Sequence, residues 1–264
     1  MQALYVNGVR IAALGLLLAT GMALGAEPDG VLHYSGRAED LASGRLLYGE
    51  QHYVRYQAGR AAERVVLYTC PNGEAFGRKA LRYPEPFAPD FELIDARQGQ
   101  HAGLRAGANG REVFFREHAG AREVRAAAPT VRGWVADAGF DEFVRANWEP
   151  LMRGDALPLQ FLIPSRLDLH RFQVKRLRAE SLNGVPAQVI RLRLSGFLGL
   201  LLPHIDAWYS QTGHVLLRYE GLSNLMDAEG EHYKVRISFP QGERRPAGET
   251  AMTAAAAVAL RSCG

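Results

Sequence analysis

Histidine and aspartate lie two residues apart at two places, a spacing that puts both side chains on one face of a β-strand. The pairs are Asp168 with His170, and His204 with Asp206. Such pairs can hold a metal ion or transfer a proton. Short His/Asp spacings also arise by chance, so we favour surface or core roles for both pairs. The sequence therefore predicts neither a metal site nor a catalytic site here.

Other catalytic signals are weak. The eight histidines include no two at the three- or four-residue spacing of helical metal ligands. The segment Ser195-Gly-Phe-Leu-Gly199 lacks the glycine that precedes the serine in a nucleophile elbow. The sequence also contains no glycine-rich phosphate loop. We expect a protein that is not an enzyme and needs no cofactor, and a hydrolase using His170 or His204 is the least favoured hypothesis.

An almost wholly apolar segment, Leu194–Pro203, is too short to span a bilayer. One interpretation is an apolar flap or cavity lining that contacts a lipid-like ligand. The alternative, which we favour on this segment alone, is a short buried helix that caps the sheet. The candidate ligand-binding residues in the segment are Phe197, Leu198, Leu200, Leu201 and Leu202.

Basic residues gather in the same half of the chain. Arg191 and Arg193 alternate with Ile190, Leu192 and Leu194, so we expect both arginines on the outward face of a strand. Attraction to anionic headgroups at a membrane surface is one interpretation. A solvated sheet face, with arginine stems covering apolar edges, is the favoured alternative. The other members of this basic group are Arg166, Arg171, Lys175, Arg176 and Arg178.

The chain has two cysteines, Cys70 and Cys263. If the protein is exported, it enters an oxidising compartment, where an even pair is first interpreted as a disulfide. Such a bond would tie the C-terminal tail to a strand end near Cys70. The alternative, two free thiols, stays open because the sequence gives no Cα separation.

The elements that position these residues are mostly strands. In Glu231–Phe239, apolar and polar residues alternate, which is typical of an antiparallel sheet with one buried and one wet face. Turn residues at Pro71-Asn72-Gly73 and at Asn183-Gly184 predict hairpins. We therefore expect an α+β fold, a mostly antiparallel and curved β-sheet wrapped around one or two helices.

One helix is predicted at about 138–153. Its apolar residues form a single stripe, with Asp137 as a candidate cap, Gly154 at the end and Pro150 expected to kink the last turn. The stripe consists of Phe140, Phe143, Val144, Trp148, Leu151 and Met152. We expect residues 27–247 to form a single β-rich domain with this helix inserted, and residues 248–264 to form a helical or loose tail.

The first 26 residues have the order of a secretory signal peptide. Arg10 precedes an uncharged run, and small residues follow at Ala23, Gly25 and Ala26. We expect cleavage after Gly25 or Ala26 and a periplasmic mature protein without a transmembrane segment. The chain carries 31 Lys and Arg against 28 Asp and Glu, a near balance that gives no case for a nucleic-acid partner.

The second half of the chain resembles the periplasmic lipoprotein-carrier group (LolA/LolB-like) and related exported domains of unknown function. The resemblance lies in the strand and turn patterns of Phe172–Leu194, Asp206–Tyr219 and Tyr233–Phe239. It implies a half-barrel sheet around helices with an apolar cavity between them. The chain departs from the outer-membrane receptor member, because it has no cysteine to carry a lipid after the expected cleavage site.

Two further hypotheses follow. The first is a periplasmic protein that binds or carries a lipid or acyl chain, lined by Phe197–Leu202, Trp148 and Trp208, with Arg191 and Arg193 near a headgroup. The second is a non-enzymatic interaction module of the cell envelope, with a filled core and a protein partner on a strand edge or on the basic face.

Overall fold

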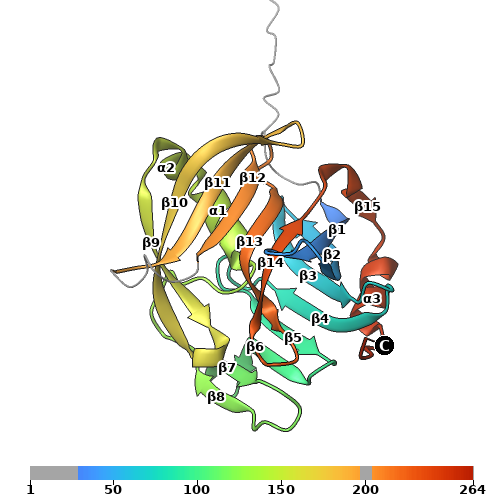
Figure 1. The fold of residues 1–264 in the computed structure, drawn as a ribbon. Coiled ribbons are helices and arrows are strands. Elements are labelled where there is room, and N and C mark those ends of the chain that lie inside the picture. The colour runs from blue at the N-terminus through green and yellow to red at the C-terminus, as the bar shows by residue number, and fades with distance from the viewer. Residues whose placement is uncertain (1–28, 197–203, 264) are drawn as a thin grey trace, which may run out of the picture.

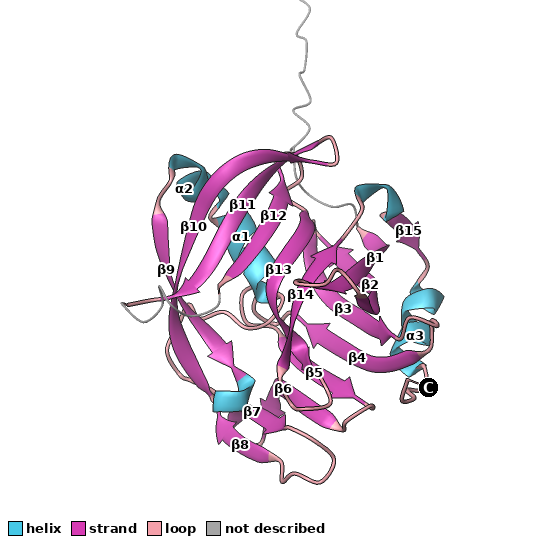
Figure 2. Cartoon of the chain, in the orientation of Figure 1, coloured by secondary structure: helices cyan, strands magenta, loops and turns pink. Residues whose placement is uncertain are grey.

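The computed structural model describes residues 29–196 and 204–263. Within these residues it contains 15 strands and three α-helices (Figures 1 and 2). The strands of the first half are β1 (Gly30–Asp40), β2 (Leu46–Gln57), β3 (Arg60–Thr69), β4 (Ala75–Arg82), β5 (Asp90–Asp95), β6 (Gln100–Gly107), β7 (Gly110–Arg116) and β8 (Val124–Ala127). The helices α1 (Gly139–Ala146) and α2 (Trp148–Arg153) come next. The remaining elements are β9 (Ala156–Ile163), η1 (Pro164–Arg166), β10 (Asp168–Leu182), β11 (Val185–Leu194), β12 (Ile205–Ser210), β13 (Leu216–Met226), β14 (His232–Ser238), η3 (Gln241–Glu243), β15 (Arg245–Ala247) and α3 (Glu249–Ala257).

The strands form one antiparallel sheet whose two halves meet in the middle. The order is β8-β7-β6-β5-β4-β3-β2-β1-β14-β13-β12-β11-β10-β9, and β15 pairs with β1. The first and last long strands are thus neighbours, and each half of the chain extends outward from them. The sheet curves around α1 in Figure 1, which confirms the predicted α+β fold.

Strand β14 shows why the alternating segments become strands. Val235 and Ile237 lie in the same apolar cluster as Phe239, whereas Lys234, which precedes Val235, is exposed and Arg236, between the two, is only half-buried. A strand places successive side chains on opposite faces, so this pattern buries one face and leaves the other in water. Both predicted turns also form, with Asn183 and Gly184 at positive φ in the β10–β11 hairpin.

The predicted single helix is two helices. The chain breaks at Asn147, which has φ −110° and ψ 22°, and Gly154 ends α2 at φ 92°. Pro150 explains the break, because its ring would clash with the carbonyl of Ala146 four residues earlier. The interruption therefore precedes the last turn, where we expected only a kink. Asp137 is not the cap residue of α1, since Ala138 occupies that position.

The helices fill the concave side of the sheet. The predicted apolar stripe packs as one cluster against inward-facing residues of β10, β11 and β12, including Val174, Ile190 and Tyr209. Helix α1 also begins at a very close approach of two segments. A Cβ atom on Gly139 would lie 1.9 Å from the carbonyl oxygen of Phe87, so only glycine fits there.

The C-terminal segment covers the outer face of the first strands. Met252 and Ala255 of α3 pack on Val65 and Leu67 of β3. Cys70 and Cys263 form a disulfide with a Cα–Cα distance of 5.7 Å, which confirms the bonded alternative. The Arg261 N–H donates to the carbonyl of Ala75 at 2.9 Å. The C-terminal tail is therefore a helix followed by an extended segment that the disulfide and this hydrogen bond hold to the sheet.

Buried charges and a candidate binding surface

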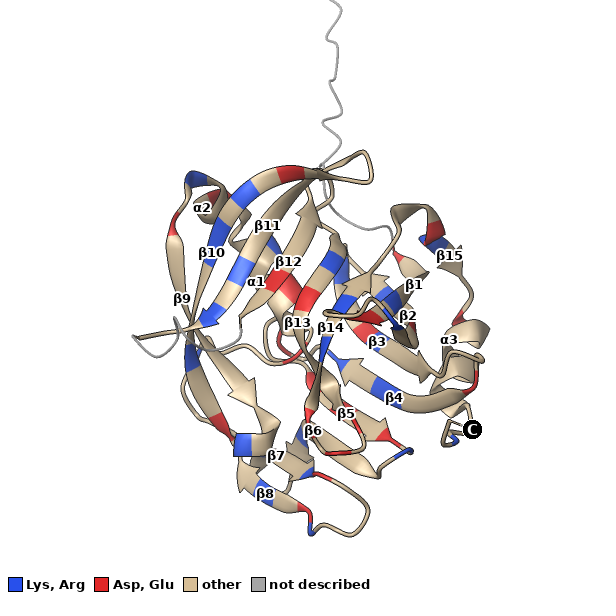
Figure 3. Ribbon diagram, viewed as in Figure 1, with Lys and Arg blue, Asp and Glu red and all other residues tan. Residues whose placement is uncertain are grey.

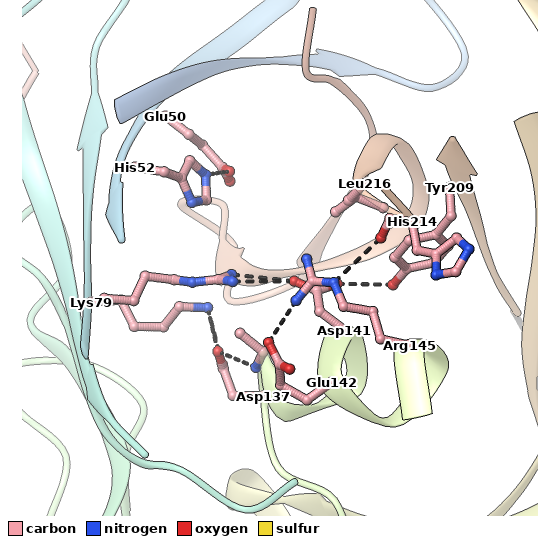
Figure 4. A network of polar contacts seen from close by, with 12 residues as sticks. Glu50, His52, Lys79, Asp137, Asp141, Glu142, Arg145, Tyr209, His214 and Leu216 are labelled. Carbon is pink, nitrogen blue, oxygen red and sulfur yellow. Dashed lines mark hydrogen bonds and ion pairs between the residues drawn. The ribbon is translucent and has the colours of Figure 1, made fainter. Parts of the chain in front are cut away.

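Cations from the sheet meet acids from the helix inside the fold (Figure 4). Arg64 of β3 donates from both terminal nitrogens to Oδ2 of Asp141 on α1, each at 3.3 Å. Lys79 of β4 lies 2.8 Å from Oδ1 of Asp137, which precedes α1. Asn224 of β13 also donates to Asp137, at 3.0 Å. These contacts join both halves of the sheet to the start of α1.

Asp141 is held as a carboxylate. Tyr209 donates its hydroxyl hydrogen to Oδ1 of Asp141 at 2.8 Å, so each carboxylate oxygen has a donor. Burial disfavours the charge, but the guanidinium groups of Arg64 and Arg145 and the Tyr209 hydroxyl outweigh it. The pKa of the Asp141 carboxyl therefore lies below its ordinary value, and the ion pair persists at neutral pH.

A second buried pair lies on β2. Nε2 of His52 lies 2.7 Å from Oε2 of Glu50, and the imidazole stacks on the ring of Tyr34. Burial lowers the pKa of His52, although the Glu50 carboxylate opposes this. The imidazole is therefore neutral at pH 7 and donates a hydrogen bond to Glu50.

This network positions the start of α1 against the sheet. Its central charged side chains, Arg64 and Asp141, are 6% and 10% exposed and already bind one another. Sequence reasoning missed the network. The available signal was register, because Arg64 shares its strand face with Val66 and Tyr68, which are both core residues.

The outer face of β10 and β11 differs from the buried network, because its cations face solvent. Lys175 lies directly across from Arg191, and Gln173 across from Arg193. With the exposed Leu177 they line a depression of about 210 Å³. We call these five residues the basic outer face. Arg191 and Arg193 thus lie on the outward face of a strand, as the alternation predicts.

Carboxylates neutralise this face only in part. Arg191 donates two hydrogen bonds to Asp206 of β12, each at 2.7 Å. Arg193 donates to the amide oxygen of Gln173 at 3.0 Å. Among the described residues, neither Lys175 nor Arg193 has a carboxylate partner. Figure 3 shows several basic segments on β10 and β11 beside an acidic segment on β12.

The two predicted tryptophans do not meet. Trp148 lies in the cluster on the concave side and stacks on His214, with ring centroids 3.8 Å apart. Trp208 lies in a separate cluster on the other face of β12 and donates its indole hydrogen to Glu180. The predicted ligand-binding residues Phe197, Leu198, Leu200, Leu201 and Leu202 lie outside the described residues.

The His/Asp pairs make the following contacts. His204 Nε2 lies 3.8 Å from Oδ2 of Asp206, whose oxygens already accept hydrogen bonds from Arg191. Asp168 accepts the backbone N–H of Leu169. In residues 29–196 and 204–263, no three His, Cys, Asp or Glu side chains converge as metal ligands.

A larger depression, about 320 Å³, lies at the rim near the ends of β2, β3 and β4. Its charged residues have partners of opposite sign. Arg55 lies 2.7 Å from Glu63, and Asp90 lies 2.7 Å from Arg111. The rim depression therefore presents balanced charge, unlike the basic outer face.

No helix among the described residues is long and apolar enough to cross a membrane.

No protein-family model matches the sequence, and no curated protein matches it. One similar solved structure is the β-barrel-like protein of domain of unknown function DUF1849 from Brucella abortus. It is 7% identical, with a TM-score of 0.37, and the alignment covers 82% of this chain and 98% of that chain. Another is described as "a putative lipoprotein from Parabacteroides distasonis ATCC 8503". It is 12% identical, with a TM-score of 0.34 and coverages of 84% and 97%. At this level of similarity neither structure assigns a function or a site residue, and the resemblance to lipoprotein carriers stays a prediction.

Proposed function

We propose that this protein is an exported, non-enzymatic binding protein of the cell envelope that holds an anionic group on its basic outer face. The observation that carries the proposal is the excess of positive charge there. Three cations, Lys175, Arg191 and Arg193, line one depression, and a single carboxylate, Asp206, is paired with one of them.

Cross-strand geometry supports a role for this charge. Side chains directly opposite each other on antiparallel strands have Cβ atoms about 5 Å apart, and like charges in such pairs are destabilising. Lys175 and Arg191 form such a pair. Asp206 offsets part of this repulsion through its hydrogen bonds with Arg191, and a bound anion would reduce it further while accepting charge-assisted hydrogen bonds from Lys175 and Arg193.

The size of the depression limits the ligand. Its volume of about 210 Å³ is smaller than the roughly 300–1,000 Å³ of pockets that enclose a drug-sized molecule. A phosphate or carboxylate group fits, with the rest of the ligand outside. Arg191 and Arg193 are among the ligand-binding residues that the sequence predicts, and Lys175 belongs to the predicted basic group, whereas Trp148 and Trp208 take structural roles.

Titration with inorganic phosphate tests this proposal. Binding is monitored by the NMR signals of the arginine Nε–H groups and of the backbone of β10 and β11. Lys175→Gln and Arg193→Gln should each weaken phosphate binding about tenfold, the value of one charge-assisted hydrogen bond. Matched controls are Lys234→Gln and Arg60→Gln, because both residues are exposed and lie on other strands. Equal binding by all four variants, or no binding by the wild type, would contradict the proposal.

A further inference from the structure

An apolar side chain lies among the cations of the basic outer face. Leu177 is 39% exposed and lines the same depression as Lys175, Arg191 and Arg193. The pairing of β10 with β11 shifts between Arg176 and Arg178, and Leu177 is the residue in between. Leu177 lies two residues after Lys175 on the same strand, so both side chains are on the outer face and line the depression.

The basic outer face carries both positive charge and an exposed apolar side chain, and this combination indicates the kind of ligand. A free inorganic anion would use the cations and gain nothing from Leu177. The interface of an anionic bilayer offers both phosphate groups and hydrocarbon within a few ångströms of each other. Lysine and arginine suit such a boundary, because their aliphatic stems lie along apolar surface while their charged ends reach the phosphates.

We infer that the basic outer face docks on an anionic lipid bilayer, with lipid phosphates bound by Lys175 and Arg193 and with Leu177 inserted among the headgroups. This inference rests on the proposed function, since it names the source of the anion. Charge complementarity supports this occupant: the described residues around the depression leave two cations without a carboxylate. The alternative source, a free phosphate, becomes an outcome of the test.

Flotation of the mature protein with two kinds of vesicle tests the inference. One kind is phosphatidylcholine alone, and the other is an equal mixture of phosphatidylcholine and phosphatidylglycerol. We expect binding to the anionic vesicles only, weakened ~fivefold for each of Lys175→Gln and Arg193→Gln. Leu177→Ser should weaken vesicle binding about threefold to tenfold through lost apolar contact, while leaving the affinity for inorganic phosphate unchanged.

The matched control is Leu41→Ser. Leu41 is also 39% exposed, but it follows β1, and β11, β12, β13 and β14 separate β1 from β10. It should bind vesicles as the wild type does. If phosphate binds and neither vesicle does, or if Leu177→Ser binds vesicles normally, the bilayer inference fails and the proposed function stands. If neither phosphate nor vesicles bind, both fail.

Discussion

Replacing Asp141 by asparagine removes the negative charge at the centre of the buried network. The side chain of Arg64, 6% exposed, would then keep its charge without a counter-charge at 3.3 Å. The new amide could still accept the hydroxyl of Tyr209, but it would turn an N–H donor toward the guanidinium. Breaking a buried ion pair in this way costs about 3–5 kcal/mol of stability.

Urea unfolding followed by tryptophan fluorescence measures this cost. With a slope of about 3 kcal/mol per molar urea, the Asp141→Asn midpoint should fall by about 1 to 2 M. Asp155→Asn is the matched control. Its partner Arg153 lies 3.1 Å away on the surface, and such exposed pairs contribute about 0–1 kcal/mol.

A double variant separates lost attraction from stranded charge. Arg64→Met combined with Asp141→Leu removes both charges and should recover at least half of the stability that Asp141→Asn loses. The loss in Asp141→Asn should also vanish in acid. Because the folded pKa of Asp141 is lowered, the carboxylate contributes stability above its unfolded pKa of about 3.9, and this is lost as the pH falls through the folded value. A midpoint shift below about 0.3 M at pH 7 would refute the stranded-charge argument.

Three further predictions concern the fold. Cys70→Ser with Cys263→Ser should lower stability by about 2–5 kcal/mol in thermal unfolding, because the bond closes a long loop with a sequence separation of 193; thiol titration of denatured, unreduced wild type should find none. Gly139→Ala should lower the unfolding temperature strongly, since its Cβ would lie 1.9 Å from the carbonyl of Phe87, whereas Gly242→Ala, with nothing within 4 Å, should not. The lowered folded pKa of His52 means that its contribution is present above the unfolded pKa of about 6.5 and is lost as the pH falls through the folded value. His52→Gln should therefore flatten the fall in stability below about pH 6.5, and an unchanged profile would contradict this assignment.

The sequence predicts those features of the fold that depend on local patterns. Alternation identifies β14 and the outward position of Arg191, and turn residues locate the β10–β11 hairpin. The apolar stripe identifies the segment that packs in the concave side. These signals are local because side-chain direction repeats every two residues in a strand and every 3.6 in a helix.

Features that depend on residues distant in sequence could not be predicted from such local patterns. The pairing of β1 with β14 brings together residues about 200 positions apart, and nothing within either strand specifies its neighbour. The excess charge at Lys175 depends on a register that puts it opposite Arg191. The inward direction of Lys79 was hidden because Arg78 beside it is equally basic, so alternation does not distinguish them.

The most direct test of the central claim is a crystal structure of the mature protein with a short-chain phosphatidylglycerol, grown without phosphate or sulfate. We expect a lipid phosphate within hydrogen-bond distance of the Lys175 ammonium and the Arg193 guanidinium, with glyceride carbons against Leu177. A lipid bound elsewhere, with the depression on β10 and β11 holding only water, would contradict it.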